Sequence, residues 1–274
     1  MRIDGIRASN FKTFRELNLD LGPYDVLIGT NAAGKSNFID ILKFVRDIAL
    51  HGLENAVSLQ GGGEYIQNIC VESTEPVALE LRLHPVPRPF VMRFCEDREK
   101  HIEAAVSSCT YRLVLAFGPG RFSVADERIA ARCRIGAGGA APIEGEVVLG
   151  RDGNGAGTYA VHPRDIQARI DFASVNPRRL APQESLLESP FSIPLFAPLL
   201  HRLAAFFRDI GIYDFDPKIS RKTTSPMGMA ELEPDGSNLA IVLRRILENA
   251  GEREMLLPLI SEILPFVEDV NVER

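Results

Sequence analysis

The sequence predicts an α/β protein in which a phosphate-binding loop is followed by an antiparallel β region and then by a helical region. Three observations support this fold class. Residues 29–36 combine two glycines, four intervening residues, a lysine and a serine, and they stand between an apolar run and a helical pattern. Residues 61–175 hold short apolar runs broken by turn residues, and later apolar residues recur at helical spacing. We therefore expect an N-terminal lobe over residues 1–60, a β region over 61–175 and a helical region over 176–274.

The first residues predict a hairpin and then a third strand. Residues 3–11 alternate loosely between apolar and polar, and residues 14–21 place three leucines on one strand face. Gly22 and Pro23 then turn the chain into residues 24–28, a short apolar run suited to a buried strand. The phosphate-binding loop would therefore follow a strand, as this type of loop requires.

The loop carries the residue types that bind a nucleotide phosphate. Its glycines would let N–H groups approach phosphate oxygens, Lys35 would reach the β- and γ-phosphates, and the Ser36 hydroxyl would bind Mg²⁺. Apolar residues beyond Gly34 predict a helix, whose N-terminus would add to the attraction. A glycine-rich turn beside a solvated lysine is the plain alternative, and both apolar flanks argue against it. The expected loop residues are Gly29, Thr30, Asn31, Ala32, Ala33, Gly34, Lys35 and Ser36.

The middle of the chain predicts antiparallel strands, whereas a kinase or a small GTPase would alternate helices with parallel strands. The guanine-reading Asn-Lys-x-Asp motif of GTPases is also absent from the sequence. The glycine-rich residues 136–141 predict a hairpin loop, because Pro142 follows directly and no long helix opens there. The expected strands are residues 77–83, 90–94, 111–117, 144–149 and 159–161.

The last hundred residues predict helices. Apolar residues recur at helical spacing over 199–210, and the pattern stops at Gly211. A second helix is expected to follow Gly236 and to end before Gly251, with Asp235 or Ser237 capping its first turn.

Composition and charge limit the classes of protein to which the chain can belong. Acidic residues exceed basic ones, 37 against 31, so no global positive field favours nucleic acid. Basic clusters at residues 178–179, 218–222 and 244–245 are expected to be solvated faces. The sequence has no apolar run of spanning length and no signal-peptide pattern, so we expect a cytoplasmic protein without a membrane partner. The sequence has four cysteines without metal-type spacing, and we expect them to be reduced thiols, which supports a cytoplasmic protein. They are Cys70, Cys95, Cys109 and Cys133.

The order of motifs near the N-terminus resembles a known family. Asn10, Phe11 and Lys12 come early, and a hairpin and a phosphate-binding loop near residue 30 follow. This opening resembles ABC-class P-loop ATPases of the SMC, RecF and OLD type. Residues 234–240, Pro-Asp-Gly-Ser-Asn-Leu-Ala, are similar to a stretch of bacterial RecF-like ATPases.

The resemblance implies ATP and Mg²⁺ as cofactors of an ABC-ATPase-like head. It implies that Lys35 is the catalytic residue, that Ser36 is the metal ligand and that the Asn-Phe-Lys stretch lies near the nucleotide. Lys12 and Asn37 therefore join the loop as expected cofactor-binding residues. In such proteins two heads sandwich two nucleotides, which implies a homodimer or a partner subunit that completes the ATP site, and DNA as a partner.

Two motifs of a complete head are absent from the sequence. It has no Ser-Gly-Gly-type signature, and residues 122–127 imitate the apolar strand ending in Asp-Glu only with a short, half-polar approach. Gln60 and Gln67 are the candidates for sensing the γ-phosphate. We therefore expect the N-terminal part of a head, completed by a further segment or another polypeptide, which hydrolyses ATP slowly or not at all by itself. Two alternatives stay open: a non-hydrolysing, nucleotide-gated module that recruits a nuclease or another effector, and a small-molecule kinase.

Overall fold

The computed structural model of the chain contains two compact units, Met1–Ile210 and Gly211–Arg274. The first unit holds an antiparallel sheet with helices, and the described residues of the second hold two helices. This mixed α/β architecture agrees with the fold class expected from the sequence. The structure describes residues 1–70, 75–85, 89–97, 100–137, 141–152, 154–170, 178–189, 193–216, 218–219, 231–267 and 269–272.

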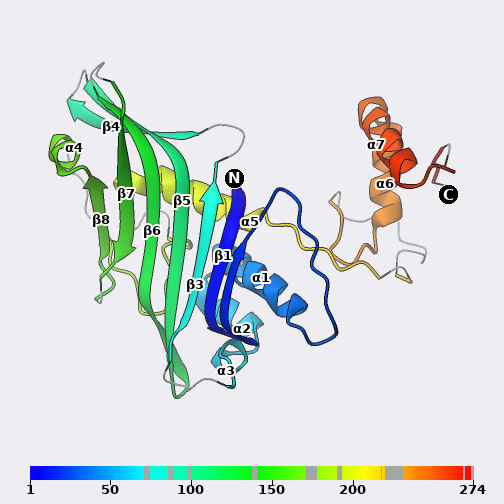
Figure 1. Ribbon diagram of the computed structural model, residues 1–274, viewed down its shortest axis with the longest axis horizontal. Helices are drawn as coiled ribbons and strands as arrows, with labels where there is room; N and C mark the ends of the chain where they lie inside the picture. Colours follow the sequence, from blue (N-terminus) through cyan, green and yellow to red (C-terminus); the bar gives the residue numbers. More distant parts are fainter. Residues whose placement is uncertain are drawn as a thin grey trace. The chain divides into compact units, whose positions relative to one another are not determined.

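An eight-stranded sheet is the centre of the first unit (Figure 1). Its strands follow the order β2-β1-β3-β5-β6-β7-β8, β4 pairs with β5, and every pairing is antiparallel. The strands are β1 (Arg2–Phe11), β2 (Phe14–Asp20), β3 (Val77–His84), β4 (Phe90–Asp97), β5 (Lys100–Gly118), β6 (Arg121–Ala137), β7 (Ile143–Arg151) and β8 (Gly157–His162).

Alternation along the strands gives the sheet one apolar and one polar face. In β3 the side chains of Val77, Leu79, Leu81 and Leu83 are buried, and those between them are partly exposed. The β5–β6 hairpin is closed by Pro119 and by Gly120, whose φ of 63° lies in the left-handed region that glycine adopts readily.

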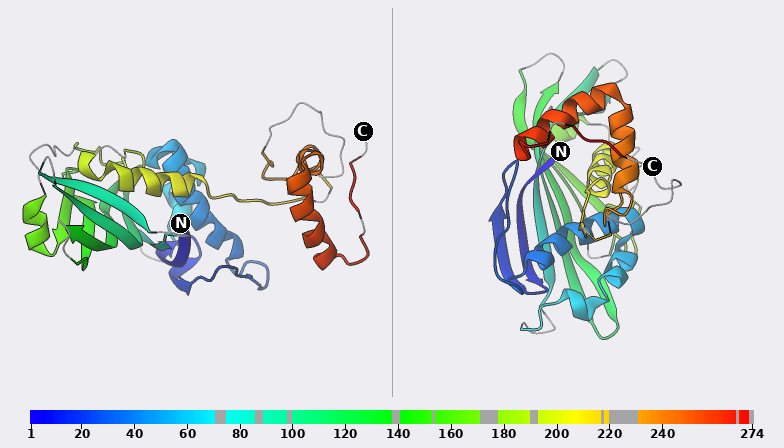
Figure 2. Two further views of the ribbon diagram at one scale, coloured as in Figure 1. Left: turned by 90° about the horizontal axis from the view of Figure 1, so that it is seen from above. Right: turned by 90° about the vertical axis from the view of Figure 1, so that its right-hand side faces the viewer.

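Helices cover the apolar face of the sheet, as Figure 2 shows for α1 and α5. The ring of Phe11 on β1 lies 6.2 Å from that of Phe44, and Tyr111 on β5 lies 5.6 Å from Phe207, between ring centroids. These contacts join the sheet to α1 and α5 in one core. The helices of this unit are α1 (Lys35–His51), α2 (Leu53–Leu59), α3 (Gly63–Ile66), α4 (Arg164–Arg169) and α5 (Ala197–Arg208), which a 3-10 turn over Pro194–Phe196 precedes.

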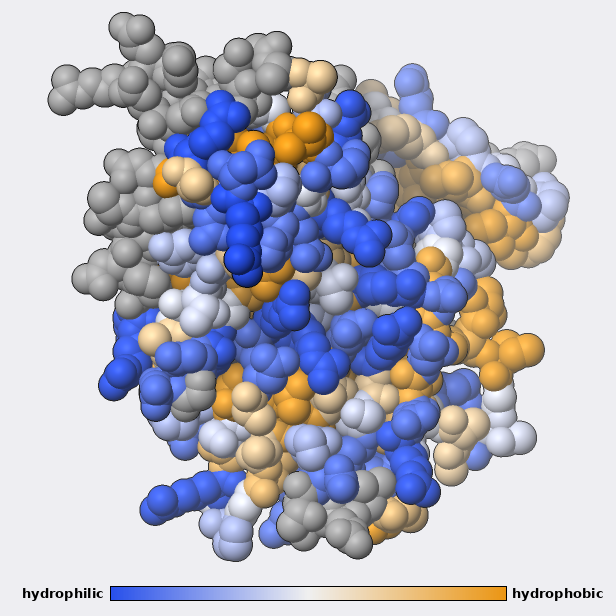
Figure 3. Space-filling view, turned by 60° about the vertical axis from the view of Figure 1, so that its left-hand side comes forward, coloured by the Kyte–Doolittle hydropathy of each residue, from blue (hydrophilic) through white to orange (hydrophobic). Residues whose placement is uncertain are grey.

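The opposite face of the sheet carries ion pairs between neighbouring strands. Arg7 pairs with Glu80 at 3.3 Å, and Arg112 pairs with Asp126 at 3.4 Å. Most of the side chains on the face drawn in Figure 3 are hydrophilic. Because exposed pairs of this kind contribute roughly 0–1 kcal/mol each, the helix-covered face dominates the stability of the sheet.

The second unit contains α6 (Leu239–Glu248) and α7 (Ala250–Ile263). The side chain of Asn249 caps α7 by accepting from the backbone N–H groups of Gly251 and Glu252. The prediction that Asp235 or Ser237 caps α6 is wrong. Its N-cap is the buried Asn238, while Asp235 accepts from the N–H of Ser237, 2.9 Å away, and forms a turn before the helix.

The strand expected over residues 24–28 is not formed. These residues belong to no strand, and their large apolar side chains are exposed. A strand needs a neighbour for its backbone groups, and none of the described strands pairs with this segment. The other expected strands correspond to β1, β2, β3, β4, β5, β7 and β8, and the strand expected over residues 14–21 extends one residue beyond β2.

The sequence patterns missed β6 and the first half of β5. β6 places Arg128, Arg132 and Arg134 toward solvent, and its buried face mixes Glu127 and the small Ala131 with isoleucines, so its apolar signal is weak. The divisions expected after residues 60 and 175 remain predictions. Of the expected loop over 136–141, residues 138–140 lie outside the described residues, as do residues 220–222 of the second basic cluster.

Candidate nucleotide-binding site

The loop expected to bind phosphate joins residues 24–28 to the first turn of α1. Ala32 and Gly34 have φ angles of 65° and 91°, so the backbone turns through the left-handed region twice within the loop. A Cβ at Gly34 would lie 3.1 Å from the Thr13 hydroxyl and 3.1 Å from the Phe14 ring. Only glycine meets both conditions without strain, because other residues adopt this φ at a cost and need that space.

The N-terminus of α1 offers free backbone donors. Its first intrahelical bond runs from the N–H of Phe38 to the carbonyl of Gly34 at 2.9 Å, so the N–H groups of Lys35, Ser36 and Asn37 precede the helical ladder. Within the described chain, no side chain caps this end. Free donors and the helix dipole together favour an anion at this position.

The Lys35 side chain folds back onto two carbonyl groups of the loop. Its ammonium group donates to the carbonyl of Gly29 at 2.8 Å and to that of Thr30 at 2.7 Å. Ser36 is exposed beside it at the start of the helix. A cation, a hydroxyl and uncapped amides thus come together around a glycine that admits no side chain, and this donor set fits a nucleotide phosphate with its Mg²⁺.

The β1–β2 turn packs against the same helix end. Asn37 donates from Nδ2 to the hydroxyl of Thr13 at 2.8 Å. Lys12, with a φ of 49°, pairs with the carboxylate of Asp40 on the second turn of α1 at 2.5 Å. The structure therefore brings Lys12 and Asn37, both expected in the site, to the junction of hairpin and helix, where Asp40 holds the Lys12 ammonium.

Other residues weighed from the sequence have structural partners. Gln67 forms a bridge with Phe11, and Gln60 ends α2. Asp126 lies on the solvent face with Arg112, whereas Glu127 is fully buried on the core face. Because adjacent residues of a strand point to opposite faces, this Asp-Glu pair cannot present both carboxylates to one ion. Among the described residues, no group of three or more acidic, histidine or cysteine side chains could hold a metal.

A buried carboxylate network that sequence reasoning missed surrounds Glu127. Its Oε1 accepts from the Tyr111 hydroxyl at 3.0 Å and from the Ser185 hydroxyl at 2.6 Å, and its Oε2 accepts from the N–H of Leu186 at 2.9 Å. Burial raises the pKa of Glu127 to about 7, although all three hydrogen bonds act to lower it. The signal in the sequence was an acid at a core-facing position of β6, between Ala125 and Ile129.

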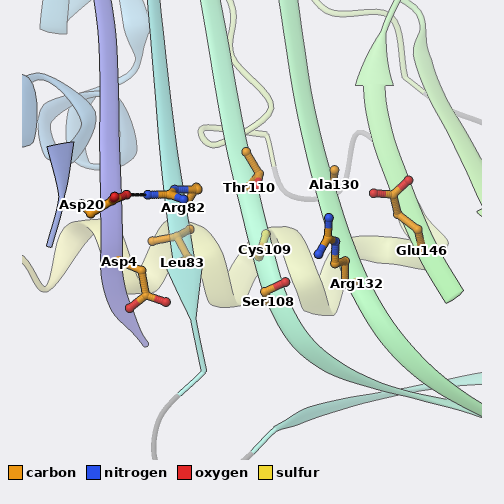
Figure 4. A pocket seen from close by; sticks show the side chains of 10 residues that line it. All are labelled: Asp4, Asp20, Arg82, Leu83, Ser108, Cys109, Thr110, Ala130, Arg132 and Glu146. Carbon is orange, nitrogen blue, oxygen red and sulfur yellow. Dashed lines mark hydrogen bonds and ion pairs between the residues drawn. The ribbon is translucent and has the colours of Figure 1, made fainter. Parts of the chain in front are cut away.

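A polar groove of about 550 Å³ opens on the solvent face of the sheet (Figure 4). Arg82 and Asp20 form an ion pair within it, and Arg132 and Glu146 lie on neighbouring strands. Its lining mixes two arginines with three carboxylates, so the groove does not clearly select an anion or a cation. The loop at the start of α1 remains the site with a definite chemistry.

Part of the chain is similar to a known protein. The chain is 31% identical over 70 residues to the "DNA replication and repair protein RecF" of Corynebacterium jeikeium (strain K411). The match covers 25% of this chain and 16% of that protein, so the chain spans only a small part of the relative. No family model matches the chain. None of the described helices has the length and apolar character needed to cross a membrane.

Proposed function

We propose that this chain is the ATP-binding part of an SMC/RecF/OLD-like ATPase with a P-loop NTPase core. In this proposal ATP binding favours dimerisation of two heads and hydrolysis reverses it, in DNA repair, DNA maintenance or phage defence. One observation carries the proposal: Lys35, Ser36 and the uncapped amides of α1 surround a loop that folds back at Gly34. The partial similarity to RecF supports the same class of ligand.

The residues divide the work of binding. The N–H groups of the loop and of the first helical turn would bind phosphate oxygens, and the Lys35 ammonium would leave the carbonyls of Gly29 and Thr30 for a phosphate. The Ser36 hydroxyl would bind Mg²⁺, which neutralises charge on the phosphates. Lys12 would serve the nucleotide only after separating from Asp40.

Hydrolysis requires more than these residues supply. A phosphate-loop enzyme needs a carboxylate on the metal and a group that positions the attacking water. Asp40, on the second turn of α1, is held by Lys12 at 2.5 Å and by Lys43 at 3.6 Å. We therefore propose that ATP turnover requires a further segment or a partner subunit, and that the chain alone binds MgATP with little turnover.

Titration calorimetry with MgATP tests the proposal, with phosphate release measured in parallel. Lys35→Ala should abolish the binding heat. Lys43→Ala, a change of the same type on the same helix but outside the loop, should leave the affinity within about twofold. Robust phosphate release by the chain alone, lost in Lys35→Ala, would show that the catalytic site is complete. Binding that persists in Lys35→Ala would place the nucleotide elsewhere.

The second candidate is a nucleotide-gated binding module without catalysis, which recruits a nuclease or another effector. The absence of a metal-binding carboxylate cluster among the described residues favours it. ATP-dependent association with no phosphate release, even in the complete assembly, would identify this function. Transfer of phosphate to an added small-molecule acceptor would instead identify a kinase.

DNA is proposed as a partner on the similarity to RecF alone. The net charge is −6, and the basic clusters are partly neutralised: Arg178 pairs with Glu184 at 3.3 Å and Arg244 with Glu248 at 2.8 Å. Binding of duplex DNA that weakens steeply with salt would support this partner, and no binding at low salt would exclude it.

A further inference from the structure

An ion pair joins the β1–β2 turn to α1 beside the candidate site. The ammonium group of Lys12 lies 2.5 Å from a carboxylate oxygen of Asp40, and the two side chains are only 17% and 20% exposed. Partial burial strengthens such a pair, because less water and salt screen its charges. The pair therefore gives the Lys12 ammonium a definite place on the second turn of α1.

The backbone that carries Lys12 is fixed from two sides. Its N–H donates to the carbonyl of Ile66 at 2.7 Å, and the next residue, Thr13, accepts a 2.8 Å hydrogen bond from Asn37. The flexible four-carbon side chain of lysine can still rotate on this fixed backbone. A change of partner by the ammonium group therefore requires no movement of the hairpin.

The helix places the proposed magnesium ligand close to the same ammonium group. Ser36 and Asp40 are four residues apart on α1, so their side chains lie on one face of the helix, about one turn or 5.4 Å apart along its axis. A lysine side chain can span a step of this size by rotation about its own bonds. The carboxylate that holds Lys12 is thus a near neighbour of the position proposed for the phosphates.

Phosphate and the Asp40 carboxylate would compete for one ammonium group. MgATP would bring several negative charges to the first turn of α1, whereas Asp40 offers a single charge on the second turn. Lys43 lies 3.6 Å from the other oxygen of Asp40, so the carboxylate keeps an opposite charge after Lys12 has left. The Phe11 ring, 5.9 Å from the Lys12 ammonium, adds only a weak attraction.

We propose that Asp40 is a positioning residue, which holds Lys12 away from the phosphates until MgATP binds and thereby sets the affinity of the loop for nucleotide. The role of Asp40 rests on the proposed function, since it concerns the regulation of that same site. The apparent affinity is then reduced by the fraction of molecules in which Lys12 is free of Asp40. Nucleotide binding would open the contact between the hairpin and the second turn of α1.

Titration calorimetry of variants of the full chain with MgATP tests this role. Asp40→Asn, which removes the charge and keeps the shape, should raise the affinity by about five- to tenfold. In a chain that also carries Lys12→Met, the same change should alter the affinity by less than about twofold, because no ammonium group remains to be freed. Asp40→Glu, which keeps the charge, should retain the affinity of the wild type.

Asp47→Asn is the matched control. Asp47 lies on the same helix, about two turns further from the loop, and pairs with Arg46 at 3.1 Å. Its loss of charge should leave the affinity for MgATP within about twofold. Urea denaturation shows which variants are folded, and Asp40→Ser provides a second neutral variant if Asp40→Asn is not.

The outcomes separate the role of Asp40 from the proposed function. An equal rise in affinity with and without Lys12 would overturn the positioning role, since Asp40 would then act only by repelling phosphate. Unchanged or weaker binding in the neutral variants, while the wild type binds MgATP through Lys35, would overturn it as well and leave the proposed function intact. Absence of MgATP binding in the wild type and in every variant would overturn both.

Discussion

Asn37, in the first turn of α1, donates a 2.8 Å hydrogen bond to the hydroxyl of Thr13, in the turn between β1 and β2. The same turn forms the wall that leaves no room for a side chain at Gly34. The β1–β2 hairpin and the helix α1 are therefore held together at the candidate site itself.

The Thr13–Asn37 bond should give a measurable coupling energy. In a double-mutant cycle with Thr13→Val and Asn37→Ala, we expect a coupling of about 0.5 kcal/mol in the free energy of unfolding, because the bond is exposed to water. Urea denaturation measures it. Asn55→Ala on α2, whose side chain bonds to the His51 carbonyl, is the matched control and should be additive with Thr13→Val. Full additivity of the first pair would show that the bond does not hold hairpin and helix together.

Gly34→Ala should lower stability and impair nucleotide binding. A left-handed φ costs a non-glycine residue roughly 1–2 kcal/mol, and the new Cβ would press on Thr13 and Phe14 at 3.1 Å. Gly120→Ala separates the two effects, since Gly120 has a φ of 63° with nothing within 4 Å of its added Cβ. It should show only the backbone cost and keep the MgATP affinity. Equal losses in both variants, by denaturation and calorimetry, would rule out a role for close packing at Gly34.

Glu127 should make the stability depend on pH. Its pKa is raised from 4.5 to about 7 in the folded chain, so the folded state binds more protons than the unfolded state between these values. Stability is therefore lost as pH rises from about 4.5 through about 7, by up to about 3 kcal/mol from this group. Unfolding free energies of the chain and of Glu127→Gln across this range should show the loss reduced in the variant. Glu64→Gln, an exposed change on α3, should follow the wild-type profile.

Phe207→Ala should destabilise the first unit strongly. The Phe207 ring is fully buried on α5 against Tyr111, and truncation of such a ring costs roughly 3–5 kcal/mol. Phe206→Ala, one residue earlier and only partly buried, should cost clearly less. Denaturant midpoints compare the two, and similar losses would mean that α5 does not pack on the sheet through Phe207.

Local sequence patterns were sufficient to predict most of the helices and strands. Alternation in β3 and helical spacing in α1 depend on neighbouring residues, and both elements lie where the sequence placed them. β6 was missed because its solvent face is arginine-rich and its core face interrupts the apolar pattern with Glu127 and the small Ala131. Such a strand is stabilised by pairing with the strands on either side of it. Its own sequence does not reveal that these neighbours are present.

By itself the sequence determined the α/β class, the loop from Gly29 to Ser36 and the helix that follows it, because these depend on residue types at short spacing. Only the tertiary structure decided that residues 24–28 lack a partner strand, that Asp40 holds Lys12, and that Glu127 joins Tyr111 to Ser185. Each of these outcomes depends on segments far apart in the chain. Whether a backbone finds a partner, or a charge finds an opposite charge, is decided by the packing of those segments.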